Sequence, residues 1–123
     1  MEFDALSNNV IGLAIEVHRV LGPGLLENTY KQCLVYEGIN SGLKVLTEVE
    51  LPVCYKNVQI ACGYRIDLLI EDKLILELKC VEKLLPIHEA QLLTYMKLAN
   101  IKTGLLINFN EKMLKQGIKR FLL

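Results

Sequence analysis

Hydrophobic and polar residues alternate most clearly between residues 65 and 79, on both sides of the polar triplet at residues 71–73. A period of two predicts two short β-strands, and the triplet predicts the turn that joins them. The strand register follows from the same pattern, because a slip of one residue would place charged side chains on the apolar face. In the expected register that face carries Ile66, Leu68, Ile70, Leu74, Leu76 and Leu78.

The opposite face of this hairpin brings charged side chains together. The same register sets Asp67 opposite Glu77, and Arg65 opposite Lys79. Like charges directly across a sheet are unfavourable, because their β-carbons lie only about 4.5–5.5 Å apart. Two converging carboxylates suit a hard divalent cation such as Mg²⁺, and Lys79 on the same face can hold a water or a substrate oxygen. The alternative is a surface of weak diagonal ion pairs, and the hairpin pattern leaves both open.

Two helices and two strands are predicted before this hairpin. The helices cover residues 8–21 and a segment from residue 25 or 26 to 38, and the strands cover residues 44–55 and a segment that begins at residue 57 or 59. Ser7 or Asp4 is the expected cap of the first helix. Gly63 indicates a bulge or a close backbone approach in the second strand. We assign His18 to a favourable interaction with the dipole of the first helix.

A helix, a strand and a tail are predicted after the hairpin. They cover residues 87–100, 103–109 and 111–123, and the tail is either a short amphipathic helix or a final strand. On the helix, Gln91 and Tyr95 lie four residues apart on one stripe with His88, so an amide and a phenol can reach one site. The alternative is that they are exposed side chains without a special task.

The composition narrows the class of protein. A chain of 123 residues forms one domain, and its formal net charge of zero gives no overall attraction to nucleic acid, so any such binding requires local patches. No apolar run reaches the roughly 20 residues that cross a bilayer, and the first residues lack the pattern of a signal peptide, so we expect a cytoplasmic protein without membrane contact. The cysteines show no metal-binding or disulfide spacing, and we expect all four to be buried. They are Cys33, Cys54, Cys62 and Cys80.

Three motifs in this order resemble a known group. Asp67 followed by Glu77-Leu78-Lys79 resembles the D…(D/E)-x-K core of the PD-(D/E)XK nuclease superfamily, although Ile66 stands where the name has Pro. Residues 24–30 match the G-x-x-E-x-x-Y element of its small GxxExxY family, and residues 91–95 match the Q-x-x-x-Y element of its RecB-like and lambda-exonuclease-like members. The apolar segment at residues 105–109 and the basic pair near the C-terminus are also similar to the GxxExxY family. The resemblance therefore covers nearly the whole chain.

The resemblance implies an α+β (α/β) fold with a restriction-endonuclease-like core. The expected arrangement is a central mixed four-stranded sheet flanked by helices, in the order ααβββαβ with a C-terminal element, as a single domain over residues 1–123. The expected activity is metal-dependent hydrolysis of phosphodiester bonds in nucleic acid, with DNA as the expected substrate. The iron–sulfur nucleases of the same superfamily cluster three cysteines near the C-terminus, and this chain does not.

The resemblance also assigns residues. Asp67 and Glu77 would ligate Mg²⁺ or Mn²⁺, and Glu27 would complete or position the ligand shell. Lys79 would orient the attacking water and help to stabilise charge on the phosphate. Substrate positioning would fall to Gln91, Tyr95 and Tyr30. The alternative function is a non-cleaving module that keeps the nuclease fold, binds nucleic acid or a protein partner, or forms a homodimer. The neutral charge, the small size and the lack of an appended DNA-binding domain favour it.

Overall fold

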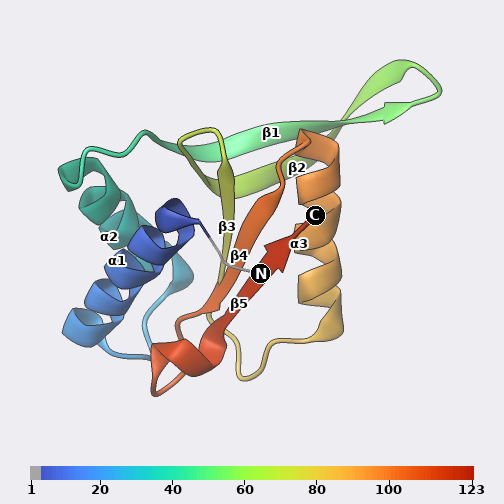
Figure 1. Ribbon diagram of the computed structural model, residues 1–123. Coiled ribbons are helices and arrows are strands. Elements are labelled where there is room, and N and C mark those ends of the chain that lie inside the picture. Colours follow the sequence, from blue (N-terminus) through green and yellow to red (C-terminus); the bar gives the residue numbers. More distant parts are fainter. Residues whose placement is uncertain (1–3) are drawn as a thin grey trace.

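Three helices, five strands and one turn of 3-10 helix follow one another in residues 4–123, which the computed structural model describes. They are α1 (Ala5–Leu21), α2 (Glu27–Asn40), β1 (Val45–Tyr55), β2 (Val58–Ile70), β3 (Leu74–Lys79), α3 (Pro86–Ala99), β4 (Thr103–Asn108), η1 (Leu114–Gly117) and β5 (Ile118–Leu122). The strands form one sheet in chain order, and β3 and β4 are parallel while the other neighbours are antiparallel. Helices α1 and α2 lie on one face of the sheet and α3 lies on the other (Figure 1).

The sequence predicts a mixed sheet flanked by helices, and this fold class is confirmed. The expected number of four strands is wrong, because the tail supplies β5, which pairs with β4. Gly117 directly precedes this fifth strand, and a β-carbon there would come within 2.6 Å of the carbonyl oxygen of Asn108. The tail therefore joins the sheet at a point of close backbone contact that suits glycine.

Each helix begins at a recognisable signal. The carboxylate of Asp4 accepts a hydrogen bond of 2.8 Å from the Ser7 backbone N–H and so caps α1. The first residue of α2 is Glu27, whose negative charge is favourable at a helix N-terminus. Pro86 begins α3, and the Nδ1 atom of His88 accepts a hydrogen bond from the Leu85 backbone N–H at 2.9 Å. His88 is therefore occupied with helix capping.

Two hydrophobic clusters fill the space between the layers. The first packs α1 and α2 against the sheet, and the second packs α3 against the other face. Leu68, Ile70, Leu74, Leu76 and Leu78 all belong to the first cluster, as the alternation predicts. Ile66 does not, and this part of the prediction is wrong: it lies in the second cluster, although it is almost completely buried there. The regular alternation of β2 therefore ends between Ile66 and Leu68.

The hairpin turns match the predicted positions. Lys56 and Asn57 both have positive φ, as the two-residue turn between β1 and β2 requires. In the turn between β2 and β3, both Glu71 and Asp72 have positive φ, whereas the sequence favours this conformation only at Asp72. The backbone N–H of Lys44 donates to Glu71 and the Lys44 ammonium pairs with Asp72, so both residues are tied to the start of β1.

The predicted bulge is also present. The register between β1 and β2 shifts between Leu51 and Val53, opposite a segment that contains Gly63 with a φ of 78°. Beyond this point the β1–β2 hairpin extends past α3 (Figure 1), and residues 54–65 are exposed. The expectation that all four cysteines are buried is therefore wrong for Cys54 and Cys62, which lie on this extension.

His18 acts differently from the expectation. Its ring is buried, and Nε2 lies 2.7 Å from the carbonyl oxygen of Glu111, so this nitrogen donates the hydrogen bond. The ring also lies beside Phe109, with a centroid distance of 6.4 Å. His18 thus fixes the end of α1 to the segment before η1.

Among the described residues, no helix is long and apolar enough to cross a membrane.

Two glycine substitutions test the packing of the sheet edge. Gly117→Ala places a methyl group against backbone atoms, and we expect a loss of about 1–3 kcal/mol in the free energy of unfolding. Gly12→Ala is the control, because this residue lies in the exposed middle of α1 and its β-carbon would meet no atom within 4 Å. We expect it to stabilise the protein by roughly 0.5–1 kcal/mol in urea titrations. Equal stability of the two variants would contradict the close contact at Gly117.

Candidate active site

The central feature of the site is the point where β2 and β3 stop pairing. The predicted register is confirmed for three pairs, from Ile70–Leu74 to Leu68–Leu76. Beyond them, side chains replace the ladder: Asp67 Oδ2 accepts from the Leu78 backbone N–H at 3.0 Å, and Glu77 Oε1 accepts from the Asp67 backbone N–H at 3.3 Å. Each carboxylate is therefore held by the neighbouring strand, and the two lie next to one another. The predicted ladder pairs of Asp67 with Glu77 and of Arg65 with Lys79 are not formed.

Burial makes this pair of acids unusual. Glu77 is 4% exposed. Burial raises the pKa of Glu77 from its ordinary 4.5 to about 8, and the negative charge of Asp67 contributes to the rise. The hydrogen bond from the Asp67 backbone and the charge of Lys79 act in the opposite direction. The site thus contains a carboxylate that a nearby positive charge would stabilise strongly.

Lys79 and Glu27 lie within electrostatic reach of this pair. Partial burial raises the pKa of Glu27, and the charge of Asp67 raises it further, whereas Lys79 lowers it. Lys79 is the last residue of β3, and its carbonyl oxygen accepts a hydrogen bond from the Phe109 backbone at 2.9 Å. The first turn of α2, the end of β3 and the part of β2 around Asp67 therefore meet at one place.

Asn108 fixes the chain just after Lys79. It is completely buried, and its side-chain amide donates to the Val81 carbonyl oxygen at 2.9 Å and accepts from the Val81 backbone N–H at 3.1 Å. An asparagine that satisfies both backbone groups of one residue holds that residue in a fixed position. The sequence indicates only that Asn108 ends a buried strand, so this anchoring contact was not predicted.

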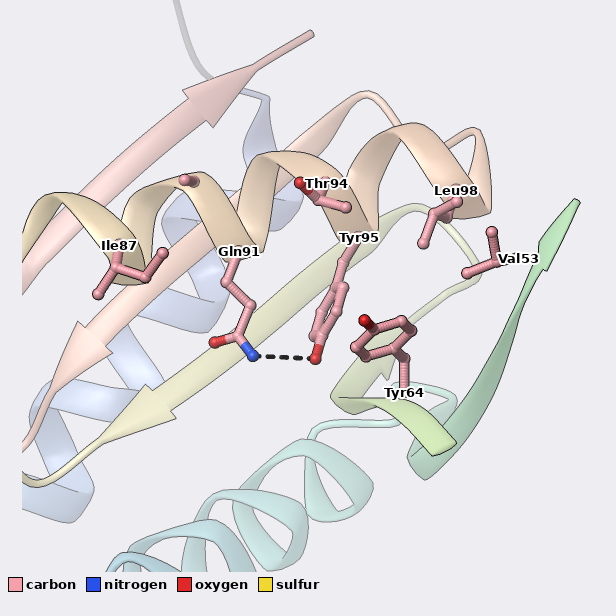
Figure 2. A pocket seen from close by; sticks show the side chains of 8 residues that line it. Val53, Tyr64, Ile87, Gln91, Thr94, Tyr95 and Leu98 are labelled. Atoms are coloured by element: carbon pink, nitrogen blue, oxygen red, sulfur yellow. Dashed lines mark hydrogen bonds between the residues drawn. The ribbon is translucent and has the colours of Figure 1, made fainter. Parts of the chain in front are cut away.

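Gln91 and Tyr95 approach the site from the other face of the sheet. The Gln91 amide donates to the Tyr95 hydroxyl at 3.0 Å (Figure 2). Burial raises the pKa of Tyr95, and the charge of Glu77 raises it further. Tyr95 also packs in the same cluster as Ile66, which directly precedes Asp67. The structure thus brings the predicted amide and phenol together near the carboxylates.

Tyr30, unlike the partly exposed Gln91, is not exposed at the site. Its ring is completely buried and stacks on Phe109 with a centroid distance of 4.6 Å. Its hydroxyl donates to the Gly22 carbonyl oxygen at 2.6 Å and accepts from the Leu25 backbone N–H at 3.1 Å. Tyr30, which the resemblance assigns to substrate positioning, has its ring and its hydroxyl engaged within the fold. It holds the loop that leads to Glu27.

Lys31 and Glu48 belong to the site, although the sequence did not indicate both. The Lys31 ammonium forms an ion pair with Glu48 and lies 4.0 Å from Asp67 Oδ1. Lys31 follows Glu27 by one helical turn, which was the available signal. Glu48 has a φ of 52°, and the ladder between β1 and β2 omits the positions of Glu48 and Asp67. An unpaired, left-handed position inside a strand leaves no trace in the alternation.

The carboxylates fit a divalent metal ion in part. Their hydrogen bonds use Asp67 Oδ2 and Glu77 Oε1, which leaves Asp67 Oδ1 and Glu77 Oε2 for a ligand. Within residues 4–123, no three His, Cys, Asp or Glu side chains lie close enough together to hold a metal ion, so Glu27 is not part of a preformed triad. Mg²⁺ commonly uses one or two protein carboxylates and completes its shell with water and substrate phosphate. The donor set fits that mode of binding.

Glu77→Gln is expected to stabilise the metal-free protein at pH 8. The folded protein keeps a proton on Glu77 between about pH 4.5 and 8 that the unfolded chain releases, so wild-type stability falls over this range. Gln has no such titration and still accepts the Asp67 N–H. We expect a gain of roughly 1–3 kcal/mol at pH 8 that disappears near pH 4.5, measured by urea unfolding in EDTA.

The control is Glu50→Gln, because the Glu50 side chain is 80% exposed. We expect this variant to change the free energy of unfolding by less than about 0.5 kcal/mol at both pH values. If the Glu77→Gln protein is no more stable than wild type at pH 8, burial of the Glu77 carboxylate does not lower the free energy of unfolding, and the prediction is wrong.

Lys31→Met is expected to destabilise the protein by about 1–3 kcal/mol at pH 7, because it leaves Glu48 and Asp67 without their shared cation. Adding Glu48→Gln should recover part of the loss, and the double-mutant cycle measures the coupling. Lys44→Met is the control, since it removes only an exposed ion pair with Asp72. A loss equal to that of the control would exclude a neutralising role for Lys31.

A comparison with known families agrees with this geometry. The family model described as PD-(D/E)XK nuclease superfamily matches residues 4–121. No curated protein matches the chain. The matched span includes every residue of the site, from Glu27 in α2 to Tyr95 in α3. This chain belongs to the PD-(D/E)XK nuclease superfamily.

Proposed function

We propose that this domain is a metal-dependent nuclease of the GxxExxY type that hydrolyses phosphodiester bonds of nucleic acid, with DNA as the expected substrate. The observation that carries the proposal is the pair of carboxylates at the point where β2 and β3 separate. Asp67 and Glu77 each accept a backbone hydrogen bond from the neighbouring strand, so two acidic side chains are fixed side by side in a partly buried place. Such an arrangement is unfavourable for folding alone.

Asp67 and Glu77 are the residues that would hold Mg²⁺ or Mn²⁺. When bound, such an ion supplies Lewis-acid polarisation of phosphoryl oxygen and a lower pKa for water. Lys79 lies next to these acids, and its side-chain nitrogen would orient water and stabilise negative charge on the phosphate. Glu27 positions the ligand shell, through water where it makes no direct contact. Gln91 and Tyr95, joined by their hydrogen bond, position the substrate.

A second candidate is a nucleic-acid-binding module that keeps the fold without cleaving. One observation favours it: among the described residues the third carboxylate, Glu27, does not complete a preformed metal cluster with Asp67 and Glu77. The Lys31 ammonium already lies 4.0 Å from Asp67 Oδ1 and partly neutralises it. A site of this kind can retain its charge pattern for binding after losing turnover.

Cleavage assays on labelled single- and double-stranded DNA and RNA test the proposal. We expect cleavage that requires Mg²⁺ or Mn²⁺, stops in EDTA, and is faster on DNA. Asp67→Asn, Glu77→Gln and Lys79→Met should each reduce the rate at least about 100-fold, because each removes a charge at the reacting phosphate. Glu50→Gln should retain the wild-type rate.

The outcomes separate the candidates. Cleavage that survives all three substitutions would come from a contaminating enzyme and would contradict the proposal. Binding of nucleic acid without cleavage under any metal condition would favour the second candidate. Calorimetric titration with Mn²⁺ adds a direct readout, because wild type should bind the ion and Asp67→Asn should not.

A further inference from the structure

A cavity lies beside the site, and Gln91 and Tyr95, to which we assign substrate positioning, form part of its wall. It lies between the β1–β2 hairpin and α3 and has a volume of about 370 Å³. The hairpin contributes Val53 and Tyr64, and α3 contributes Ile87, Gln91, Tyr95 and Leu98 (Figure 2). This volume is at the lower end of the range of about 300–1,000 Å³ for small-ligand pockets. The cavity suits one planar group with its attached sugar.

The lining indicates the chemistry of the occupant. Tyr64 is 45% exposed, and its ring lies 6.1 Å from that of Tyr95 at an angle of 53°. Figure 2 shows the two rings next to each other, with Gln91 bonded to the Tyr95 hydroxyl. The side chains that line the cavity are aromatic, aliphatic or amide and hydroxyl groups, and none of them is charged. An uncharged aromatic wall with a few polar groups suits a nucleobase and does not suit a phosphate.

The position of the cavity connects it to the carboxylates. Tyr95 lines the cavity and belongs to the same hydrophobic cluster as Ile66, the residue before Asp67, and its hydroxyl is within electrostatic reach of Glu77 and Asp67. The bulge at Gly63 directly precedes Tyr64, and bulges commonly re-aim side chains next to active sites. When a phosphate of the nucleic acid lies at Asp67 and Glu77, a neighbouring nucleotide of the same strand can therefore reach the cavity.

We propose that this cavity is a nucleobase subsite, in which one unpaired base of the nucleic acid stacks on Tyr64, so that the domain takes single-stranded or frayed ends in preference to intact duplex. A paired base is stacked on both faces and bonded along its edge, and it enters such a cavity only after leaving the helix. The inference rests on the proposed function for the position of the phosphate. The base contact itself requires no cleavage.

The test is fluorescence anisotropy of a labelled single strand and of its blunt duplex, in EDTA so that no cleavage occurs. Wild type is expected to bind the single strand more tightly than the duplex. Tyr64→Ala should weaken single-strand binding roughly 10- to 100-fold and leave duplex binding unchanged, because base–aromatic stacking is lost. Tyr64→Phe keeps the ring and should bind as wild type. Tyr64→Leu keeps the apolar contact with Tyr95 but should bind as weakly as Tyr64→Ala.

Tyr55→Ala is the matched control. Tyr55 lies on the same hairpin and is 58% exposed, but it does not line the cavity. It should retain wild-type affinity. A second series moves a single abasic nucleotide along the strand: wild type should lose affinity at one position, and Tyr64→Ala should be indifferent at every position.

The inference is overturned if wild type binds duplex as tightly as single strand, or if Tyr64→Ala and Tyr55→Ala behave alike. It is also overturned if no nucleic acid binds, which would leave the cavity to a protein partner. Failure of the proposed function is a separate result. Binding that depends on the base but gives no cleavage in Mg²⁺ would support the nucleobase subsite and contradict nuclease activity. Cleavage that is unchanged by Tyr64→Ala and by abasic substitution would support nuclease activity and contradict the subsite.

Discussion

Two carboxylates take the place of β-ladder hydrogen bonds where β2 and β3 separate, and the rest of the site depends on this exchange. Asp67 and Glu77 each satisfy a backbone N–H of the neighbouring strand. The exchange fixes both side chains without a capping helix or a loop, and it places them at the end of a sheet buried on both faces. Preorganised charge of this kind needs no rearrangement when a ligand arrives.

The surroundings of the pair limit its electrostatic cost. Lys31 reaches it from α2, and Glu48 holds Lys31 from a left-handed position inside β1. A non-glycine residue in that conformation is unfavourable by itself, and such residues persist where surrounding contacts determine them. The left-handed Glu48, the buried Lys31 and the buried Glu77 are therefore linked: the first two residues reduce the electrostatic cost of placing acids in the interior.

Local patterns predicted the hairpin register, the bulge at Gly63 and the order of the elements, because each is encoded in neighbouring residues. They did not predict that Ile66 would pack on the face of α3, since the irregularity of β2 at Asp67, where the ladder with β1 is interrupted, has no signal in the alternation. Tyr30 matched a motif, but only the fold shows that its hydroxyl is used by the loop before α2. Cys54 and Cys62 are exposed because the hairpin continues beyond the helices that would cover them.

The sheet order has a consequence for how the molecule forms. Each strand lies beside the one that precedes it in the chain, and the crossover through α3 is the parallel connection of the sheet. Local contacts form early because they close short loops. The acidic pair, ten residues apart across one turn, can thus assemble during synthesis before α3 emerges. Its surroundings are complete only with β4, which lies beside β3 at Glu77 and follows α3 in the chain.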